Sequence, residues 1–359
     1  MKDMLGPAAL RAIAAAGVAA SPRFDRDRFL AAAGQGLEAL SIMQRVRHIA
    51  DALQGALPRD LAAALPILRA MGPHLTQGFQ AVAVSEYAAR FGLPAFDEAL
   101  ETIAALTRFG SGEFAVRPFL AADPARTLAR MQSWALHEDE HRRRLASEGS
   151  RPRLPWATRV PALQADPTLA APILEALKAD PSPYVRRSVA NHLNDISRER
   201  PGWVLDHLAQ WDQREPATRW IIRHALRSLI KAGEPRALAL IGAGAAAEVE
   251  VAEFSITPAA LPLGGRIALR VVLRSRAAAA QTLVVDYRIH YVRAGGRSGA
   301  KVFKLRTFLL APGAQASLAT GQEIRDFSTR RHYPGQHRVE LLVNGEALAQ
   351  ASFELLAGA

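Results

Sequence analysis

The spacing of hydrophobic residues changes once along the chain, near residue 245. Before that point apolar residues recur every three or four positions, for example over residues 29–49 and 61–71, which is the period of amphipathic helices. Prolines interrupt the pattern repeatedly, and three of them follow an aspartate: Asp123-Pro124, Asp166-Pro167 and Asp180-Pro181. An Asp-Pro pair offers an N-cap oxygen directly before a residue suited to the first helical turn. Short helices separated by proline turns predict stacked helical pairs, an α-solenoid.

An internal repeat supports this prediction. Residues 141–146, 184–190 and 220–225 align on Arg144, Arg187 and Arg223, with spacings of 43 and 36 residues. These spacings lie in the range of HEAT-like helix pairs. The helical part is therefore expected to be a HEAT-like repeat solenoid.

After residue 246 the hydrophobic period changes to two, which predicts β-strands. The alternating runs cover residues 249–254, 266–271, 282–291, 300–305, 336–343 and 349–355. Two hairpin turns are indicated, Gly295-Gly296 and Asn344-Gly345, and Asn-Gly supplies the positive φ angles that a type I′ turn needs. We therefore expect an all-α domain at residues 1–245 and an immunoglobulin-like β-sandwich without its disulfide at residues 247–359.

The composition favours a polyanionic partner. The 359 residues include 45 Lys and Arg against 34 Asp and Glu, a net charge of +11, and no cysteine. A strongly basic chain suits nucleic acid, although an Arg-rich surface set by genomic base composition is the alternative. The lack of cysteine excludes disulfides, thiolate zinc sites and a cysteine nucleophile. An apolar run at residues 14–20 is preceded by Asp3 and Arg11, so it predicts an amphipathic helix, no membrane span and a cytoplasmic protein.

The densest polar block covers residues 134–156 and contains an H-E-x-x-H string from His137 to His141. On a helix such a string places two imidazoles and a glutamate together, as in zinc peptidases. Three arginines follow directly at positions 142–144 and would oppose a metal cation. We therefore predict no metal site and no cofactor, and interpret the string as a solvated helix face.

Basic and amide side chains recur at equivalent places of the repeat. Guanidinium groups suit phosphate because they bind it through planar, bidentate hydrogen bonds. If equivalent helices present such groups to one side, they form a positively lined surface for a DNA backbone. The expected DNA-binding residues are Arg144, Arg151, Arg153, Arg186, Arg187, Asn191, His192, Asn194 and Arg223.

Several segments resemble the AlkC-type DNA alkylation repair family. The residues that carry the resemblance are 45–53, 109–119, 134–156 and 184–195, and it runs through the helical half, from about residue 1 to 242. Its most specific phrase is LASEGSRPRLPW at residues 145–156. The resemblance implies a DNA glycosylase of HEAT-like repeats that excises positively charged N-alkylated bases, such as 3-methyladenine and 3-methylcytosine, from duplex DNA without full base flipping. A sandwich tail is similar to the family branch with an immunoglobulin-like domain.

The resemblance also implies the reacting residues. Family carboxylates match Glu113, Glu148 and Asp195, and a family aromatic residue matches Trp156. Glu148 and Asp195 would stabilise the oxocarbenium-like sugar and orient water, Glu113 would complete the acidic pocket, and Trp156 would cover the sugar or the lesion. The expected partner is duplex DNA with alkylated bases, bound by a monomer.

Two other functions remain open from the sequence. A non-catalytic solenoid would keep the basic surface and bind DNA backbone or branched DNA, but it would not require carboxylates that face phosphate. A peptide-binding scaffold with an adhesion-type sandwich is disfavoured because no export signal is expected.

Overall fold

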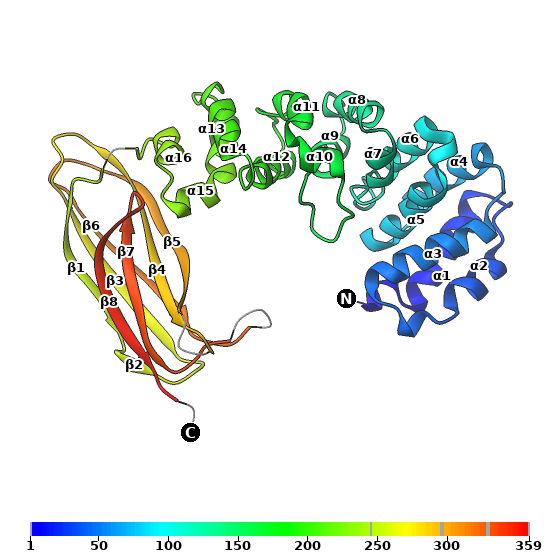
Figure 1. Ribbon diagram of the computed structural model, residues 1–359. Coiled ribbons are helices and arrows are strands. Elements are labelled where there is room, and N and C mark those ends of the chain that lie inside the picture. Colours follow the sequence, from blue (N-terminus) through cyan, green and yellow to red (C-terminus); the bar gives the residue numbers. More distant parts are fainter. Residues whose placement is uncertain (1, 245, 295–297, 328–330, 358–359) are drawn as a thin grey trace. The chain divides into compact units, whose positions relative to one another are not determined.

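Helices fill the first two-thirds of the chain and strands the remainder, as predicted (Figure 1). A computed structural model describes residues 2–244, 246–294, 298–327 and 331–357. Its α-helices are α1 (Pro7–Ala20), α2 (Arg26–Gly34), α3 (Ile42–Ala56), α4 (Leu61–Met71), α5 (Gly78–Phe91), α6 (Phe96–Leu106), α7 (Arg117–Ala122), α8 (Pro124–Ala135), α9 (Glu140–Gly149), α10 (Pro161–Ala165), α11 (Ala171–Ala176), α12 (Pro183–Ile196), α13 (Pro201–Ala209), α14 (Pro216–Ala225), α15 (Arg227–Ala232) and α16 (Pro235–Leu240). Its strands are β1 (Val249–Thr257), β2 (Ala260–Leu261), β3 (Arg266–Ser275), β4 (Gln281–Val292), β5 (Ser298–Leu310), β6 (Gln315–Glu323), β7 (Gly335–Val343) and β8 (Glu346–Leu355).

The chain forms two compact units, and each of them is made of two separate stretches of sequence. Unit 1 comprises residues 1–200 and 211–225, and unit 2 comprises residues 201–210 and 226–359. Helices α13, α15 and α16 thus belong to the unit of the strands. The boundary near residue 245 expected from the sequence remains a prediction about domains, and the backbone passes between the two units at three points.

Unit 1 is built from two rows of helices (Figure 1). In one row, called the inner row here, α3 packs on α5, α9 on α12 and α12 on α14. In the other row α4 packs on α6 and α8 on α11. The repeated arginines Arg144, Arg187 and Arg223 therefore lie on three successive helices of the inner row.

Helix α12 illustrates why the inner row forms. Ser182 occupies its N-cap and Pro183 its first turn, where a missing N–H costs nothing. Val185, Val189 and Leu193 recur at every fourth position and are buried, so one stripe of the helix packs into the core.

The Asp-Pro pairs behave in two ways. Asp123 and Asp166 are N-caps, because their carboxylates accept from the backbone N–H groups of Arg126 and Thr168. The prediction is wrong for Asp180, since α12 starts three residues later. Its carboxylate instead accepts from the Ser182 backbone N–H and pairs with Arg143, so it joins α12 to α9.

Unit 2 contains a β-sandwich. A three-stranded sheet has the order β1-β3-β6, and a five-stranded sheet has the order β2-β8-β7-β4-β5. Neighbouring strands are antiparallel except β2 and β8. Each run with a period of two lies in a strand, whereas β6 was missed because its sequence QASLATGQE contains few apolar residues. Buried Leu273, Val285 and Leu341 of the two sheets share one core cluster.

One of the two expected hairpin turns lies in the described part of the chain. Asn344 and Gly345 have φ values of 49° and 86°, the left-handed conformation of a type I′ turn, and they join β7 to β8. The Gly295-Gly296 turn lies outside the described residues.

The outer face of the five-stranded sheet is covered by helices of the same unit. Leu238 and Ala243 pack against Val284 of β4, with Ile230 of α15 beside them. Gly233 and Gly345 meet so closely that a Cβ atom on Gly345 would lie 2.7 Å from the Gly233 Cα. Asp286, two residues after Val284 on β4, is buried.

The N-terminal segment Lys2–Ala20 is, by length and composition, apolar enough to cross a membrane, with a mean hydropathy of 1.2. In the structure 44% of that window is buried, and Leu5, Leu10 and Ile13 belong to the core. Core helices and signal sequences both pass the same test, so the segment is weak evidence for a membrane span.

Candidate DNA glycosylase site

The candidate site is centred on the C-terminal half of α9. Asp139 is the N-cap of this helix and accepts from the backbone N–H of His141. His137 therefore precedes the helix, and its Nδ1 accepts from the backbone N–H of Asp139. The H-E-x-x-H string is a turn and a helix start, so it does not place two imidazoles on one helical face. Further along α9, Ser147 and Glu148 are buried.

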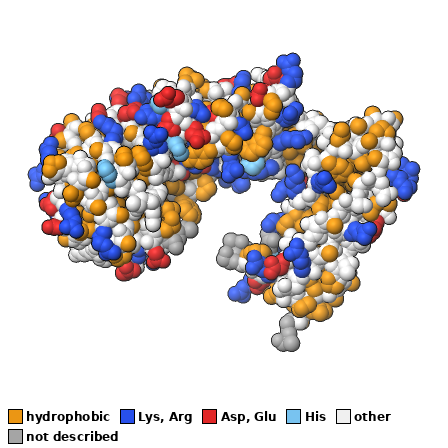
Figure 2. All heavy atoms as spheres, turned by 180° about the vertical axis from the view of Figure 1, so that it is seen from behind, with side chains coloured by type: hydrophobic (Ala, Val, Ile, Leu, Met, Phe, Trp, Pro, Cys, Tyr) orange, Lys and Arg blue, Asp and Glu red, His pale blue; other side chains and the backbone are white. Residues whose placement is uncertain are grey.

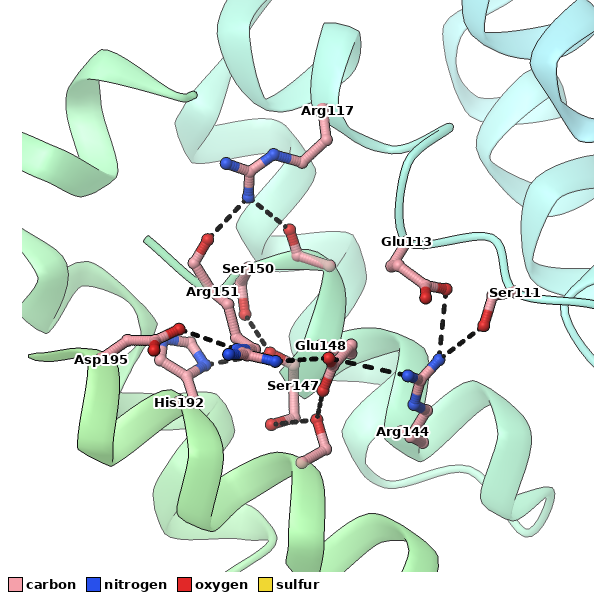
Figure 3. Close-up of polar contacts among 12 residues, drawn as sticks. Ser111, Glu113, Arg117, Arg144, Ser147, Glu148, Ser150, Arg151, His192 and Asp195 are labelled. Carbon is pink, nitrogen blue, oxygen red and sulfur yellow. Dashed lines mark hydrogen bonds and ion pairs between the residues drawn. The ribbon is translucent and has the colours of Figure 1, made fainter. Parts of the chain in front are cut away.

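Three carboxylates and two guanidinium groups form a chain of ion pairs (Figure 3). Arg144 Nη1 lies 3.2 Å from Glu113 Oε2, and Arg144 Nη2 lies 3.7 Å from Glu148 Oε1. Arg151 bridges the next two carboxylates, with Nη1 2.6 Å from Glu148 Oε1 and Nε 2.8 Å from Asp195 Oδ2. We call Glu113, Arg144, Glu148, Arg151 and Asp195 the ion-pair chain. The structure thus brings together the three carboxylates expected to react.

The carboxylate oxygens differ in whether they accept a hydrogen bond. Glu148 Oε1 accepts from Arg151, and Glu148 Oε2 accepts from the Ser188 hydroxyl at 2.6 Å. Asp195 Oδ1 and Glu113 Oε1, by contrast, accept no hydrogen bond within the described ranges. Both oxygens of Glu148 are therefore engaged, whereas Asp195 and Glu113 each have one oxygen that accepts no hydrogen bond from the described residues.

The electrostatics of the cluster favour close pairing. Burial raises the pKa of Asp195, and the hydrogen bond and charge of Arg151 oppose this rise. Burial acts to lower the pKa of Arg151, but Asp195 and Glu148 more than offset it and the pKa is raised. The arginines stay charged and hold the carboxylates in fixed positions.

Two aromatic side chains belong to the segments that carry the cluster: Trp156 follows Arg151 by five residues, and Tyr184 lies on α12 with Asp195. Trp156 is 63% exposed and has a φ of 65°, a left-handed conformation that is strained for a bulky residue. Tyr184, which the sequence-based reasoning missed, lies under the Arg144 guanidinium, with 5.1 Å between the Arg144 Cζ and the ring centre. Its ring also meets His141 at 5.7 Å.

A signal for Tyr184 was present in the repeat. The position three residues before each aligned arginine holds a ring, namely His141, Tyr184 or Trp220. Arg186 likewise lies 5.9 Å from the Trp220 ring. The inner row therefore repeats an arginine stacked on a ring of the next helix, a cation–π arrangement.

The expected DNA-binding residues fall into three groups, of which the first is exposed. Arg187 and Arg223 are exposed and form no ion pair among the described residues, so they are available to phosphate. Arg153 is exposed but pairs with Glu199. Figure 2 shows basic side chains gathered along the lower margin of the middle of the helical unit, where acidic side chains are scarce.

Other expected DNA-binding residues are turned inward. His192 is fully buried, its Nδ1 lies 3.0 Å from the Ser147 carbonyl oxygen, and burial lowers its pKa to about 3. Asn194 is buried and donates to the Ala225 carbonyl oxygen. These two side chains join neighbouring helices and are not exposed on the surface of the protein, because residues 192 and 194 lie on the packed side of α12.

The remaining four of this set are only partly available. Arg144 and Arg151 are committed to the ion-pair chain. Arg186 donates through Nη1 to the carbonyl oxygens of Asp180 and Pro181. Asn191 is partly exposed on the inner row and has polar contacts of its own.

Comparison with known proteins places this arrangement in a family. Residues 86–229 match the family described as DNA alkylation repair enzyme, and residues 250–357 match the C-terminal Ig-like domain of YhaZ. The uncharacterised protein YhaZ of Bacillus subtilis (strain 168) is 36% identical over 335 residues, which cover 93% of each chain. The alkylpurine DNA glycosylase AlkC of Pseudomonas fluorescens, solved bound to DNA containing an abasic site analogue, is 50% identical, with 99% of each chain covered and a TM-score of 0.94. The chain therefore belongs to the DNA alkylation repair enzyme family and carries a YhaZ-type C-terminal Ig-like domain.

Proposed function

We propose that this protein is a DNA glycosylase that excises positively charged N-alkylated bases, of the 3-methyladenine and 3-methylcytosine class, from duplex DNA. The ion-pair chain is the observation that carries the proposal, because it brings three buried carboxylates together in a protein whose net charge is strongly positive. Similarity to AlkC, an alkylpurine DNA glycosylase bound to DNA, supports the reaction type and the partner.

The substrate's own charge makes this chemistry feasible. An N-alkylated base with a positive charge leaves as a neutral molecule when its glycosidic bond breaks, so no acid is needed to protonate it. The bonding electrons depart with the base, and positive charge develops on the sugar. Fixed carboxylates stabilise such a charge electrostatically. Water then attacks C1′ and loses a proton, which leaves an abasic site.

The hydrogen bonds of the carboxylate oxygens support a different role for each carboxylate. Asp195 Oδ1 would orient the attacking water and accept its proton, because Asp195 Oδ2 is held by Arg151 and Oδ1 is not engaged by the described residues. Glu113 would face the sugar through Oε1. Glu148 would hold Arg151 and Ser188 in place and add negative charge. Trp156, exposed five residues after Arg151, would cover the sugar or the lesion.

Arg187 and Arg223 would hold phosphates on either side of the lesion, since both are exposed on successive inner-row helices. No full extrusion of the base is required, because a duplex bent along the inner row would expose the lesion's sugar. We expect a monomer that acts in the cytoplasm on the nucleoid.

The pairing of Glu148 and Asp195 with Arg151 favours one alternative. If the arginines neutralise the carboxylates permanently, the protein would bind DNA without catalysis. Both functions predict salt-dependent DNA binding, and only the glycosylase releases base.

The deciding experiment is release of methylated bases from alkylated duplex DNA, identified by mass spectrometry. We expect wild type to release base, and Asp195→Asn to slow single-turnover release by about 10²- to 10³-fold if Asp195 is the general base. Asp180→Asn is the matched control, because Asp180 is also buried and paired with an arginine of α9 but lies outside the ion-pair chain. Release by wild type and Asp195→Asn at equal rates refutes the assigned role. DNA binding without release by any protein favours the alternative.

A further inference from the structure

A buried arginine outside the ion-pair chain holds the segment that carries Arg151 and Trp156. Arg117 begins α7 and is 2% exposed. No carboxylate of the described residues pairs with it, so its charge is not neutralised by a neighbouring anion. Burial, together with the positive charge of Arg151, lowers the pKa of Arg117 to about 10. A cation kept in such a place calls for an explanation, because desolvation opposes it.

All the side-chain hydrogen bonds that Arg117 makes to the described residues go to backbone carbonyls of one segment. Its Nη1 donates to the Gly149 oxygen at 2.9 Å and the Arg151 oxygen at 2.8 Å (Figure 3). Its Nε donates to the Thr158 oxygen at 2.9 Å. The acceptors lie 32 to 41 residues away along the chain. One planar guanidinium therefore ties both ends of the irregular segment 149–158 to the first turn of α7.

The segment needs such an anchor because it has little regular structure of its own. Between α9 and α10 it forms only turns, and buried carbonyls without a partner are costly. Trp156 adopts its strained left-handed conformation here, and strain persists only where surrounding contacts fix it. At the start of the segment a Cβ on Gly149 would lie 2.7 Å from Val116 Cγ2, so the end of α9 lies directly against the residue before Arg117.

We propose that Arg117 is a positioning residue for base excision, a role that rests on the proposed glycosylase function. By fixing segment 149–158 it keeps Arg151 between Glu148 and Asp195 and holds Trp156, five residues further along the segment, in its exposed position. The fork of Nε and Nη1 performs this task, since the two nitrogens bind carbonyls at opposite ends of the segment. A lysine would keep the charge but lose the fork.

Arg117→Lys, Arg117→Gln and a matched control separate positioning from stability. Arg143→Lys is the control, because Arg143 also donates to two backbone carbonyls, those of His137 and Glu138, away from segment 149–158. For each protein we would measure thermal stability, hydrogen–deuterium exchange of segment 149–158, affinity for DNA with an abasic-site analogue, and single-turnover release of methylated base.

We expect all three variants to lose some thermal stability. Only the Arg117 variants should exchange faster in segment 149–158. Base release per folded molecule should fall in the order wild type, Arg117→Lys, Arg117→Gln, and Arg117→Lys should lose about 10- to 100-fold, as displacements near 1 Å at a reacting centre do. Affinity for the abasic-site DNA should change less than the rate, since phosphate contacts are untouched.

Unchanged exchange of segment 149–158 in both Arg117 variants overturns the proposal. So does a release rate in Arg117→Lys that equals wild type once the folded fraction is counted, because charge alone would then suffice. If Arg117→Gln does not fold, Arg117→Lys decides. A wild type that binds DNA but releases no base overturns the glycosylase function itself and the positioning role with it, whereas an active wild type with unaffected variants overturns only the role of Arg117.

Discussion

Replacing Arg151 with leucine should destabilise unit 1 in a way that depends on pH. In the folded protein Arg151 is the ion partner of both Glu148 and Asp195, and all three side chains are 9% to 10% exposed. Removing one partner of a buried ion pair costs about 3–5 kcal/mol, because the other charge stays buried and unpaired. Arg151→Leu leaves two such carboxylates, so we expect a loss in this range at pH 7.5.

The pH dependence follows from the sign of the pKa shift. Burial already raises the pKa of Asp195 above 3.8 in the wild type, and Arg151 limits that rise. Without Arg151 the folded pKa rises further, so the folded state binds its proton more tightly than the unfolded state and regains stability as the pH falls. Below its folded pKa, a carboxylate recovers at most about 1.4 kcal/mol per pH unit, so the loss in Arg151→Leu should shrink between pH 7.5 and 5.5.

Urea denaturation followed by tryptophan fluorescence at pH 7.5 and 5.5 measures both effects. Arg153→Leu is the control, because Arg153 lies two residues away and pairs with Glu199, but the two side chains are 42% and 39% exposed. It should cost at most about 1 kcal/mol. Equal losses in the two variants, or a loss for Arg151→Leu that does not shrink at pH 5.5, would refute the reasoning.

Four further substitutions have defined outcomes. Arg187→Ala and Arg223→Ala should each flatten the slope of log K against log salt for duplex DNA by about one unit, whereas an unchanged slope would exclude a phosphate contact. Asp286→Asn should stabilise unit 2 at pH 8 by about 1–3 kcal/mol, measured by calorimetry. Burial raises the pKa of Asp286 to about 6, so the ionised carboxylate destabilises the folded state increasingly as the pH rises from 3.8 to that value. The gain in stability from the substitution should therefore vanish near pH 4. Trp156→Ala should leave the melting temperature within about 2 °C, since an exposed side chain contributes little to packing, and should slow base release; a normal rate would remove Trp156 from the site.

Local periodicity was enough to predict the two kinds of secondary structure. Residues 285–291 alternate strictly and lie within β4, and the Asn344-Gly345 turn follows from backbone sterics alone. Strand β6 was not predicted because only Leu318 of its residues is buried. Its position depends on pairing with β3 and not on its own hydrophobic pattern.

The residues of the candidate site were predictable from the sequence, but the contacts between them were not. The three carboxylates were identified through family resemblance, whereas the bridge of Arg151 to Asp195 joins residues 44 positions apart and depends on how α12 packs beside α9. The same packing buried His192 and Asn194, which helical spacing alone had placed with the DNA-binding residues. Arg117 gave no signal, because its partners are backbone carbonyls, which every residue possesses.

The three passages of the backbone between the two units have a practical consequence. No single cleavage separates them: a protein ending at residue 245 would keep α13, α15 and α16 but lose the sheet that α15 and α16 cover, and would expose Leu238 and Ile230 to water. A strand fragment beginning there would in turn leave Val284 bare. Truncations that aim to ask what the sandwich contributes would thus report misfolding of the remnant, and surface substitutions in the intact chain are the sound way to ask it.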